Sequence, residues 1–299
     1  MRNAFADEVT KLASEDERIV FLSGDIGNKL FDKLKLVAPG RFYNCGVAEA
    51  NMISLGCGLA SQGLRPIAYT ITPFITYRCI EQIRVDACYH NQPLTFVGVG
   101  AGLGYTSLGA THHSLEDIAM LRSLPNITIL CPADPVETRG AIRAAINVNG
   151  PVYIRLGKKG EPVLFQDNTN FEIGTPNKLV DGENTVILSC GTITAVALEL
   201  VKELKSCALY SFHTVKPLNT QFLKEIFNQY ERVITIEEHS LIGGFGSAVA
   251  EWAVDNRVDT KNLVRFGTKD EFLHGANDYS LGAKSLGLGL EDLRSKINT

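Results

Sequence analysis

Short apolar runs alternate with longer amphipathic segments along most of the chain. The runs are rich in β-branched residues, which favours strands, and apolar positions three or four residues apart in the intervening segments favour helices. Strands are predicted in this way at residues 19–22, 66–69, 94–99, 127–130, 152–155, 185–189, 208–212, 233–236 and 263–266. Helices are predicted at 48–61, 74–90, 114–122, 135–147, 192–205, 220–229 and 246–256. Strands that alternate with helices indicate an α/β fold built on parallel sheets.

The alternation stops once, between Gly157 and about Lys178, where Lys, Gly, Pro, Asp and Asn dominate. This composition is typical of a linker. We therefore predict two parallel-sheet α/β domains, at residues 1–160 and 179–299, joined by a linker at 161–178. The 299 residues are enough to give each domain a core of its own.

Composition narrows the class of protein. Hydrophobic residues make up 45% of the chain and charged residues 21%, and the net charge of -4 comes without any basic run. This predicts a soluble globular protein with no nucleic-acid partner and no membrane span, and the first eight residues do not resemble a signal peptide. The seven cysteines are odd in number and contain no CxxC pair. They predict reduced thiols in a cytoplasmic protein rather than disulfides, a redox pair or a zinc site.

The most informative segment is CGVAEAN at residues 45–51. Glu49 falls in the first turn of an otherwise apolar predicted helix, after a strand-like segment at 41–44 and a glycine. Its apolar neighbours predict a carboxylate that is buried or lies in a cleft. A glutamate is also stabilised at a helix start by the helix dipole, and the spacing alone favours this structural role over catalysis.

Other candidate side chains have ordinary structural interpretations as well. Phe74 and Tyr77 lie three apart on a helical pattern and so share one face, as a pair of core aromatics would. His112 and His113 follow a glycine-rich loop at 100–110, but no third ligand stands at a suitable spacing for a metal. Asp25 follows the first predicted strand, where a turn aspartate is common.

Several motifs together resemble thiamine-diphosphate-dependent transketolases. They are GVAEANMI at 46–53, EQIR at 81–84, THHSLED at 111–117, RSLPN at 122–126, PAD at 132–134, GPVYIRLG at 150–157, EEH at 237–239 and GGFGS at 243–247. They occur in the family's order and cover nearly all of the first predicted domain. The chain is similar to the carboxyl-terminal half of a split transketolase. This implies a pyrimidine-binding domain followed by a transketolase carboxyl-terminal domain.

The resemblance implies a cofactor and the residues that hold it. In this family the glutamate that matches Glu49 hydrogen-bonds N1′ of the aminopyrimidine of thiamine diphosphate, which favours the tautomer that removes the C2 proton of the thiazolium. Phe74 would stack on the aminopyrimidine, and Tyr77 would line the same pocket. Asp25 matches an aspartate that contacts the cofactor.

It also implies a substrate site that differs from the usual one. His112 matches the active-site histidine, which binds a substrate oxygen as charge develops, and His113 either contributes or caps the loop. The family's phosphate-binding arginine falls on Lys158, which can bind phosphate without a bidentate fork. A loop histidine and a loop acid of the family fall on Gly100 and Leu108. These departures predict a sugar other than the usual ketose and aldose phosphates.

A partner subunit is implied as well. The family binds the diphosphate and its Mg²⁺ through a GDG…N segment on a preceding domain. GDIG at 24–27 lacks the third-position glycine and the asparagine, and the chain begins almost directly at the pyrimidine-binding domain. We therefore expect no metal site on this chain, and a separate amino-terminal subunit in an α2β2 heterotetramer. Alone, the chain should be inactive or nearly so.

Three functions stay open. The first is a transferase that moves a two-carbon ketol unit from a ketose to an aldose. The second is a beta chain of a 2-oxo-acid dehydrogenase or a deoxyxylulose-type synthase, which decarboxylates a 2-oxo acid. The third is a non-catalytic subunit that has kept only the fold. The motifs at 111–113 and 122–126 favour the first; the sugars, the pathway, the role of His239 and dimerisation without the partner are left open.

Overall fold

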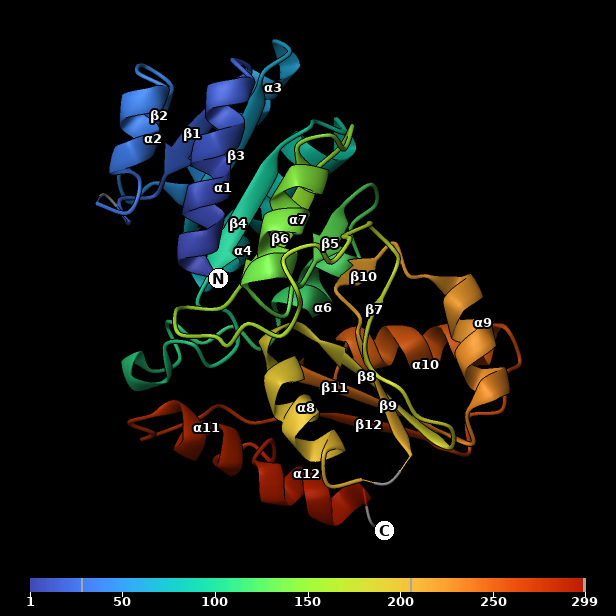
Figure 1. Ribbon diagram of the computed structural model, residues 1–299. Helices are drawn as coiled ribbons and strands as arrows, with labels where there is room; N and C mark the ends of the chain where they lie inside the picture. Colours follow the sequence, from blue (N-terminus) through green and yellow to red (C-terminus); the bar gives the residue numbers. More distant parts are fainter. Residues whose placement is uncertain (28, 205, 298–299) are drawn as a thin grey trace.

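The computed structural model describes residues 1–27, 29–204 and 206–297. Positions 205, 298 and 299, at the ends of the predicted helix 192–205 and of the predicted second domain, lie outside these ranges. Within them the chain forms a seven-stranded sheet and a five-stranded sheet, each flanked by helices (Figure 1). Most strand pairs in both sheets are parallel. The predicted pair of parallel-sheet α/β units is therefore confirmed.

The first sheet has the strand order β10-β5-β6-β4-β3-β1-β2. Its strands are β1 (Ile19–Ser23), β2 (Phe42–Asn44), β3 (Arg65–Ile71), β4 (Thr95–Val99), β5 (Thr128–Leu130), β6 (Val152–Leu156) and β10 (Thr214–Lys216). The central strands are buried along nearly their whole length, as expected of a parallel sheet covered by helices on both faces. Apolar runs with few polar interruptions therefore predicted them well.

Helices cover both faces of this sheet. They are α1 (Arg2–Glu15), α2 (Asp32–Val37), α3 (Glu49–Ser61), α4 (Thr72–Thr76), α5 (Ile80–Gln82), α6 (Asp117–Arg122) and α7 (Pro135–Ala145), with 3₁₀ turns η1 (Tyr77–Cys79) and η3 (Thr106–Leu108) and the π-helix η2 (Ile83–Tyr89). Helices α1 and α7 lie side by side on one face, and Figure 1 shows them in front of the sheet. Helix α3 and the π-helix share the apolar core of the other face.

Two helix predictions were wrong in detail. The segment 74–90 is not one helix, because a 3₁₀ turn and a π-helix interrupt it. The helix expected from Ser114 begins at Asp117 instead. The backbone of Ser114 pairs with Gly102 in a two-residue antiparallel bridge, so residue 114 is not part of the helix.

The second sheet has the strand order β12-β11-β8-β9-β7. Its strands are β7 (Asn177–Val180), β8 (Thr185–Cys190), β9 (Cys207–Ser211), β11 (Arg232–Ser240) and β12 (Leu263–Thr268). The helical segments around it are η4 (Gly191–Ile193), α8 (Thr194–Val201), α9 (Thr220–Gln229), α10 (Phe245–Asp255), α11 (Tyr279–Ser285) and α12 (Leu290–Ile297). All nine predicted strands are confirmed across the two sheets.

The two sheets are joined by more than the linker. Strand β10, from the second half of the chain, pairs antiparallel with β5 at the edge of the first sheet. One apolar cluster contains residues of both halves. The boundaries at 1–160, 161–178 and 179–299 stay a prediction. None of the helices in the described ranges is both long and apolar enough to traverse a bilayer.

Candidate active site

Glu49 lies at the start of α3, where the sequence placed it. Its side chain is only 4% exposed. Just ahead of it, Gly46 has a φ of +68°, which glycine adopts without strain, and its N–H donates to the side chain of Asn44 over 2.9 Å. This turn leads the chain from β2 into α3. The prediction of a buried carboxylate at a helix start is confirmed.

Arg78 is the residue that meets this carboxylate. Its Nη1 lies 3.2 Å from Oε2 of Glu49, and its guanidinium carbon lies 3.9 Å from the ring centroid of Phe74. The arginine side chain is 47% exposed, so a buried acid is paired with a cation at the surface. Sequence reasoning assigned Arg78 no role. Its spacing of four from Phe74 was the available signal, since side chains four apart on a helical segment lie close together.

His112 lies against the same aromatic ring. The rings of Phe74 and His112 are 5.1 Å apart with an interplanar angle of 67°, an edge-to-face contact. The Thr111 hydroxyl is 2.9 Å from Nδ1 of His112. Burial lowers the pKa of His112, and the charges of His113 and Arg78 lower it further. The imidazole is therefore neutral at pH 7, and when Thr111 donates to Nδ1 the ring proton sits on Nε2.

Tyr105 extends this row of side chains towards Lys158. Its ring centroid is 5.9 Å from that of His112, and Nζ of Lys158 lies 4.5 Å from the Tyr105 centroid. Gly100 has a φ of +72°, and a Cβ at this position would overlap the Tyr105 ring. The sequence identified Gly100 as a lost histidine but missed the tyrosine that occupies the adjoining space. We call this set of successive contacts the row; its members are Glu49, Arg78, Phe74, His112, Tyr105 and Lys158.

Three other candidates lie to the side of this row. The Tyr77 hydroxyl donates to Glu116 over 2.7 Å, and Tyr77 lines a cavity of about 360 Å³ between the histidine loop and residues 271–273. His113 is buried, with Nε2 2.9 Å from a backbone oxygen of its own loop. Asp25 is exposed and accepts a hydrogen bond from the side chain of Asn44 over 2.8 Å. Their cofactor and substrate roles stay predictions.

Two buried polar residues of the second half, His239 and Glu237, have structural partners. His239 has Nε2 3.3 Å from the backbone N–H of Ala119 and Nδ1 2.8 Å from a backbone oxygen, so it joins the two halves. The backbone N–H groups of Phe245 and Gly246 donate to Glu237, at 2.6 and 2.8 Å. The glycine turn at 243–246 is thus an ordinary strand-to-helix turn.

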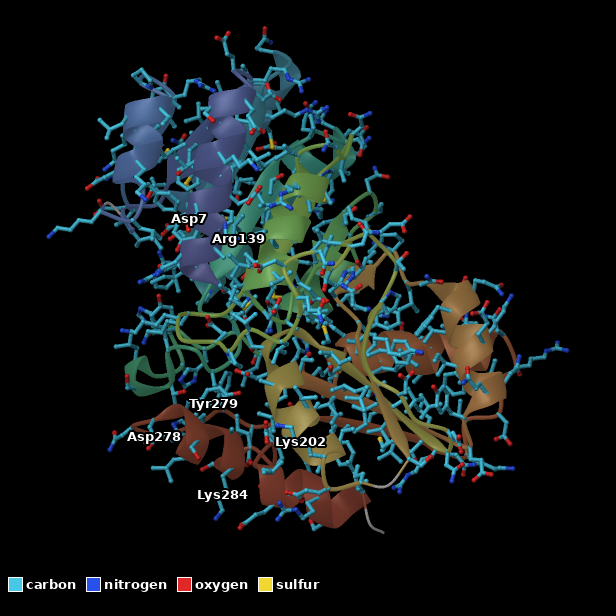
Figure 2. All side chains as sticks on the ribbon, viewed as in Figure 1. Asp7, Arg139, Lys202, Asp278, Tyr279 and Lys284 are labelled. Carbon is cyan, nitrogen blue, oxygen red and sulfur yellow. The ribbon has the colours of Figure 1, made fainter. Side chains whose placement is uncertain are left out.

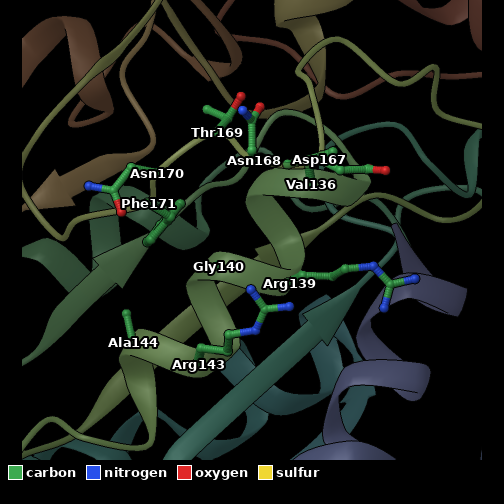
Figure 3. Close-up of a pocket in the computed structure, with 10 residues that line it drawn as sticks. All are labelled: Val136, Arg139, Gly140, Arg143, Ala144, Asp167, Asn168, Thr169, Asn170 and Phe171. Atoms are coloured by element: carbon green, nitrogen blue, oxygen red, sulfur yellow. The ribbon is translucent and has the colours of Figure 1, made fainter.

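A larger hollow of about 780 Å³ lies away from this row, between α7 and residues 167–171 (Figure 3). The two arginines on its helical wall are already paired with acids of α1. Arg143 contacts Glu8 at 2.5 Å, and Arg139 contacts Asp7 at 3.4 Å (Figure 2). These pairs hold α1 against α7. Within the part of the chain that the structure describes, no three acidic, histidine or cysteine side chains gather as metal ligands would.

Comparison with known proteins shows the family to which the chain belongs. The model of the transketolase pyrimidine-binding domain matches residues 1–161, and that of the transketolase C-terminal domain matches residues 174–283. The chain belongs to the transketolase family. The resemblance predicted from the motifs, to the carboxyl-terminal half of a split transketolase, is confirmed.

Individual relatives agree with the family match. One of the subunits of the apulose-4-phosphate transketolase of Phocaeicola vulgatus is 31% identical over 288 residues, which cover 94% of this chain and 91% of that one. 1-Deoxy-D-xylulose-5-phosphate synthase of Halothermothrix orenii is 34% identical over 91% of this chain, but only 44% of its own length is covered. Among solved structures, a split-gene transketolase described as an inactive beta4 tetramer has a TM-score of 0.87 and 32% identity, with 99% of this chain and 96% of that one covered.

Proposed function

We propose that this chain is the carboxyl-terminal subunit of a transketolase that transfers a two-carbon ketol unit from a ketose to an aldose. One observation carries the proposal: the buried carboxylate of Glu49 and the ring of Phe74 contact the same guanidinium, that of Arg78, and the Phe74 ring in turn contacts His112. A buried acceptor beside an aromatic face suits an aminopyrimidine ring, which has both a ring nitrogen and a flat face. The residues present therefore fit thiamine diphosphate.

Each residue of the row has a task in this proposal. Bound thiamine diphosphate supplies the carbon nucleophile and electron sink of ketol transfer. Glu49 holds the pyrimidine nitrogen N1′ and shares a proton with it, while Phe74 packs on the ring. Neutral His112 donates Nε2–H to a substrate oxygen on which negative charge develops. Lys158 offers a point charge to an anionic end of the sugar. Asp25, Tyr77 and His113 border these contacts.

The proposal includes a second chain. An amino-terminal subunit would supply the diphosphate and Mg²⁺ site, in an α2β2 heterotetramer. Two comparisons support this: a relative of matching length is named as one subunit of a transketolase, and a similar split-gene structure is described as an inactive assembly of beta chains. A cytoplasmic location stays part of the proposal.

The test is reconstitution with the amino-terminal subunit, thiamine diphosphate and Mg²⁺, followed by a panel of ketose donors and aldose acceptors. Wild type should form products longer by two carbons, and Glu49→Gln should lower kcat by about 10³-fold because it removes a proton-sharing carboxylate. Glu81→Gln is the matched control, since Glu81 is an exposed acid in α5. Near-normal turnover by Glu49→Gln, or full turnover by this chain alone, would contradict the proposal.

A second function has support from the synthase relative, which matches 91% of this chain. In that case the reconstituted pair would release carbon dioxide from pyruvate and transfer no ketol unit between sugars. The same reaction mixtures, supplied with labelled pyruvate, distinguish the two. Failure to bind thiamine diphosphate even with the partner present would instead indicate a non-catalytic subunit.

A further inference from the structure

The loop at residues 102–114, which carries His112 and His113, is closed at its base by two backbone hydrogen bonds. We call this base, formed by residues 102–103 and 114, the neck of the loop. Gly102 and Ser114 form the two-residue bridge, with N–H to oxygen distances of 3.0 and 2.9 Å in the two directions. His112 stands two residues before the end of this neck. The backbone at the neck therefore leads within two residues to the imidazole that contacts Phe74.

A carboxylate from the second half of the chain is hydrogen-bonded to one side of the neck. Glu238, in β11, is 2% exposed, and its Oε1 accepts the N–H of Leu103 over 2.5 Å. Its Oε2 accepts the hydroxyl of Tyr279, the first residue of α11, over 2.7 Å. Gly102 has a φ of +61°, and a Cβ there would overlap Glu238. The neck thus contains glycine at the one point where the carboxylate approaches its backbone.

Arg155 holds the other side of the neck. Its Nη2 donates to the backbone oxygen of Ser114 over 2.9 Å and to that of Glu238 over 3.0 Å. Its Nε donates to buried Asp117 over 2.8 Å. Both sides of the neck are therefore connected to Glu238. Leu103 is hydrogen-bonded to its carboxylate, and Ser114 is linked to its backbone oxygen through Arg155.

The middle of the loop contacts a helix of the second half, α11. The ring of His113 is 2.9 Å from the backbone oxygen of Thr106, in η3. Helix α11 packs on η3 so closely that a Cβ at Gly282 would contact the side chain of Thr106 at 2.8 Å. Tyr279 is labelled on α11 in Figure 2. Helix α11 therefore contacts both the carboxylate of Glu238, through Tyr279, and the middle of the loop, at Thr106.

From these contacts we infer that Glu238 is a positioning residue, through which the carboxyl-terminal half fixes the histidine loop and so the place of His112. The effect on catalysis rests on the proposed function, whereas the effect on loop order does not. Glutamine at this position can keep both contacts, because its oxygen accepts the Leu103 N–H and its amide donates to the Tyr279 oxygen. Alanine keeps neither.

The first experiment is hydrogen exchange on the purified chain, without cofactor or partner. Loss of the two buried hydrogen bonds of Glu238 should speed amide exchange at residues 102–114 by about 10- to 100-fold in Glu238→Ala. Glu238→Gln should stay within about threefold of wild type. If Glu238→Ala does not fold, Tyr279→Phe, which removes one donor only, should still speed exchange by about threefold or more.

Glu237→Gln is the matched control, because Glu237 is equally buried in the same strand but caps α10. Its effect should be confined to peptides near residue 245. Unchanged exchange at 102–114 in Glu238→Ala, or in Tyr279→Phe if the alanine variant does not fold, would overturn the inference. Equal exchange at 102–114 in Glu237→Gln and Glu238→Ala would overturn it too.

The second experiment uses the reconstituted complex. Glu238→Ala should lower kcat/KM for the sugar about tenfold or more, while the Kd of thiamine diphosphate stays within about twofold, because Glu49 and Phe74 lie outside the loop. Glu238→Gln should restore kcat/KM. Parallel losses of cofactor binding and turnover would indicate a general structural defect and refute the positioning role. If the wild-type complex transfers no ketol unit, the proposed function fails but the exchange result stands.

Discussion

Replacing Glu137 with glutamine should stabilise the chain at pH 8 much more than at pH 5. Glu137 lies on α7 and is fully buried at the junction of the two halves. It accepts the N–H of Ala133 over 2.8 Å, the hydroxyl of Ser211 over 2.9 Å and the amide of Asn177 over 3.0 Å. Burial nevertheless raises the pKa of Glu137 from 4.5 to about 7, because these neutral donors only partly replace water.

The sign of the pH dependence follows from this raised pKa. Between pH 4.5 and 7 the folded chain holds a proton on Glu137 that the unfolded chain has released, so stability falls as the pH rises. A pKa difference of this size destabilises the fold by about 1 kcal/mol at pH 5 and about 3 kcal/mol at pH 8. Glutamine cannot ionise and escapes this loss. The gain from Glu137→Gln should therefore be about 2 kcal/mol larger at pH 8 than at pH 5.

Buried His213 acts in the opposite direction. Its ring stacks on Phe171 at 4.0 Å, and burial lowers its pKa from 6.5 to about 4. Its contribution to stability is present above pH 6.5 and is lost as the pH falls towards 4. In wild type the two effects oppose each other across this range. Glu137→Gln removes the carboxylate effect and leaves that of His213 in place, so the stability of the variant relative to wild type should rise as the pH increases.

Urea unfolding followed by circular dichroism at pH 5, 6, 7 and 8 measures these differences. The linear slope with urea should not change between variants, because the same surface is exposed on unfolding. Glu225→Gln, at an exposed position on α9, is the control for removing an acid elsewhere. A stability difference between Glu137→Gln and wild type that is the same at pH 5 and pH 8 would refute the raised pKa as its cause.

Two further variants test ion pairs that could not be predicted from the sequence. Arg78→Met should tighten thiamine diphosphate binding by the reconstituted complex about fivefold in a fluorescence titration, since its contacts with Glu49 and Phe74 no longer have to be broken; weaker binding would contradict this. Asp117→Asn leaves the buried guanidinium of Arg155 without its counter-ion and should cost about 3 kcal/mol in urea unfolding at pH 7. A loss below about 1 kcal/mol would show that this ion pair contributes little.

The elements that the sequence predicted best are those whose burial is continuous. Strand β4 is buried along all five of its residues, and its run of apolar side chains is visible without any knowledge of its neighbours. Strand β10 is only three residues long and exists because it pairs with β5, more than eighty residues earlier. Ser114 lies outside the helix predicted at 114–122 for the same reason, since its backbone groups pair with a partner twelve residues earlier, Gly102.

The residues of the candidate site also divide into those that the local sequence predicts and those that only packing reveals. Glu49 could be placed because its burial follows from the apolar residues of its own helix. The ion pair with Arg78 could not, because the two residues are 29 positions apart and meet only when α3 packs beside η1. Helical spacing connects Arg78 to Phe74 alone. Local pattern therefore found the carboxylate, and only packing revealed its counter-charge.

The space beside Gly100 could not be predicted from the sequence. From the sequence it looks like the loss of a polar contact, but the ring of Tyr105 fills the space that a side chain at this position would need. The two positions form one unit, because any side chain at 100 requires the ring at 105 to move away from His112 and Lys158. A positive φ at Gly100 opposes the same change independently. The change in substrate contacts that the sequence predicts therefore depends on Gly100 and Tyr105 together, and we expect that replacing Gly100 alone would not supply the contact of a loop histidine.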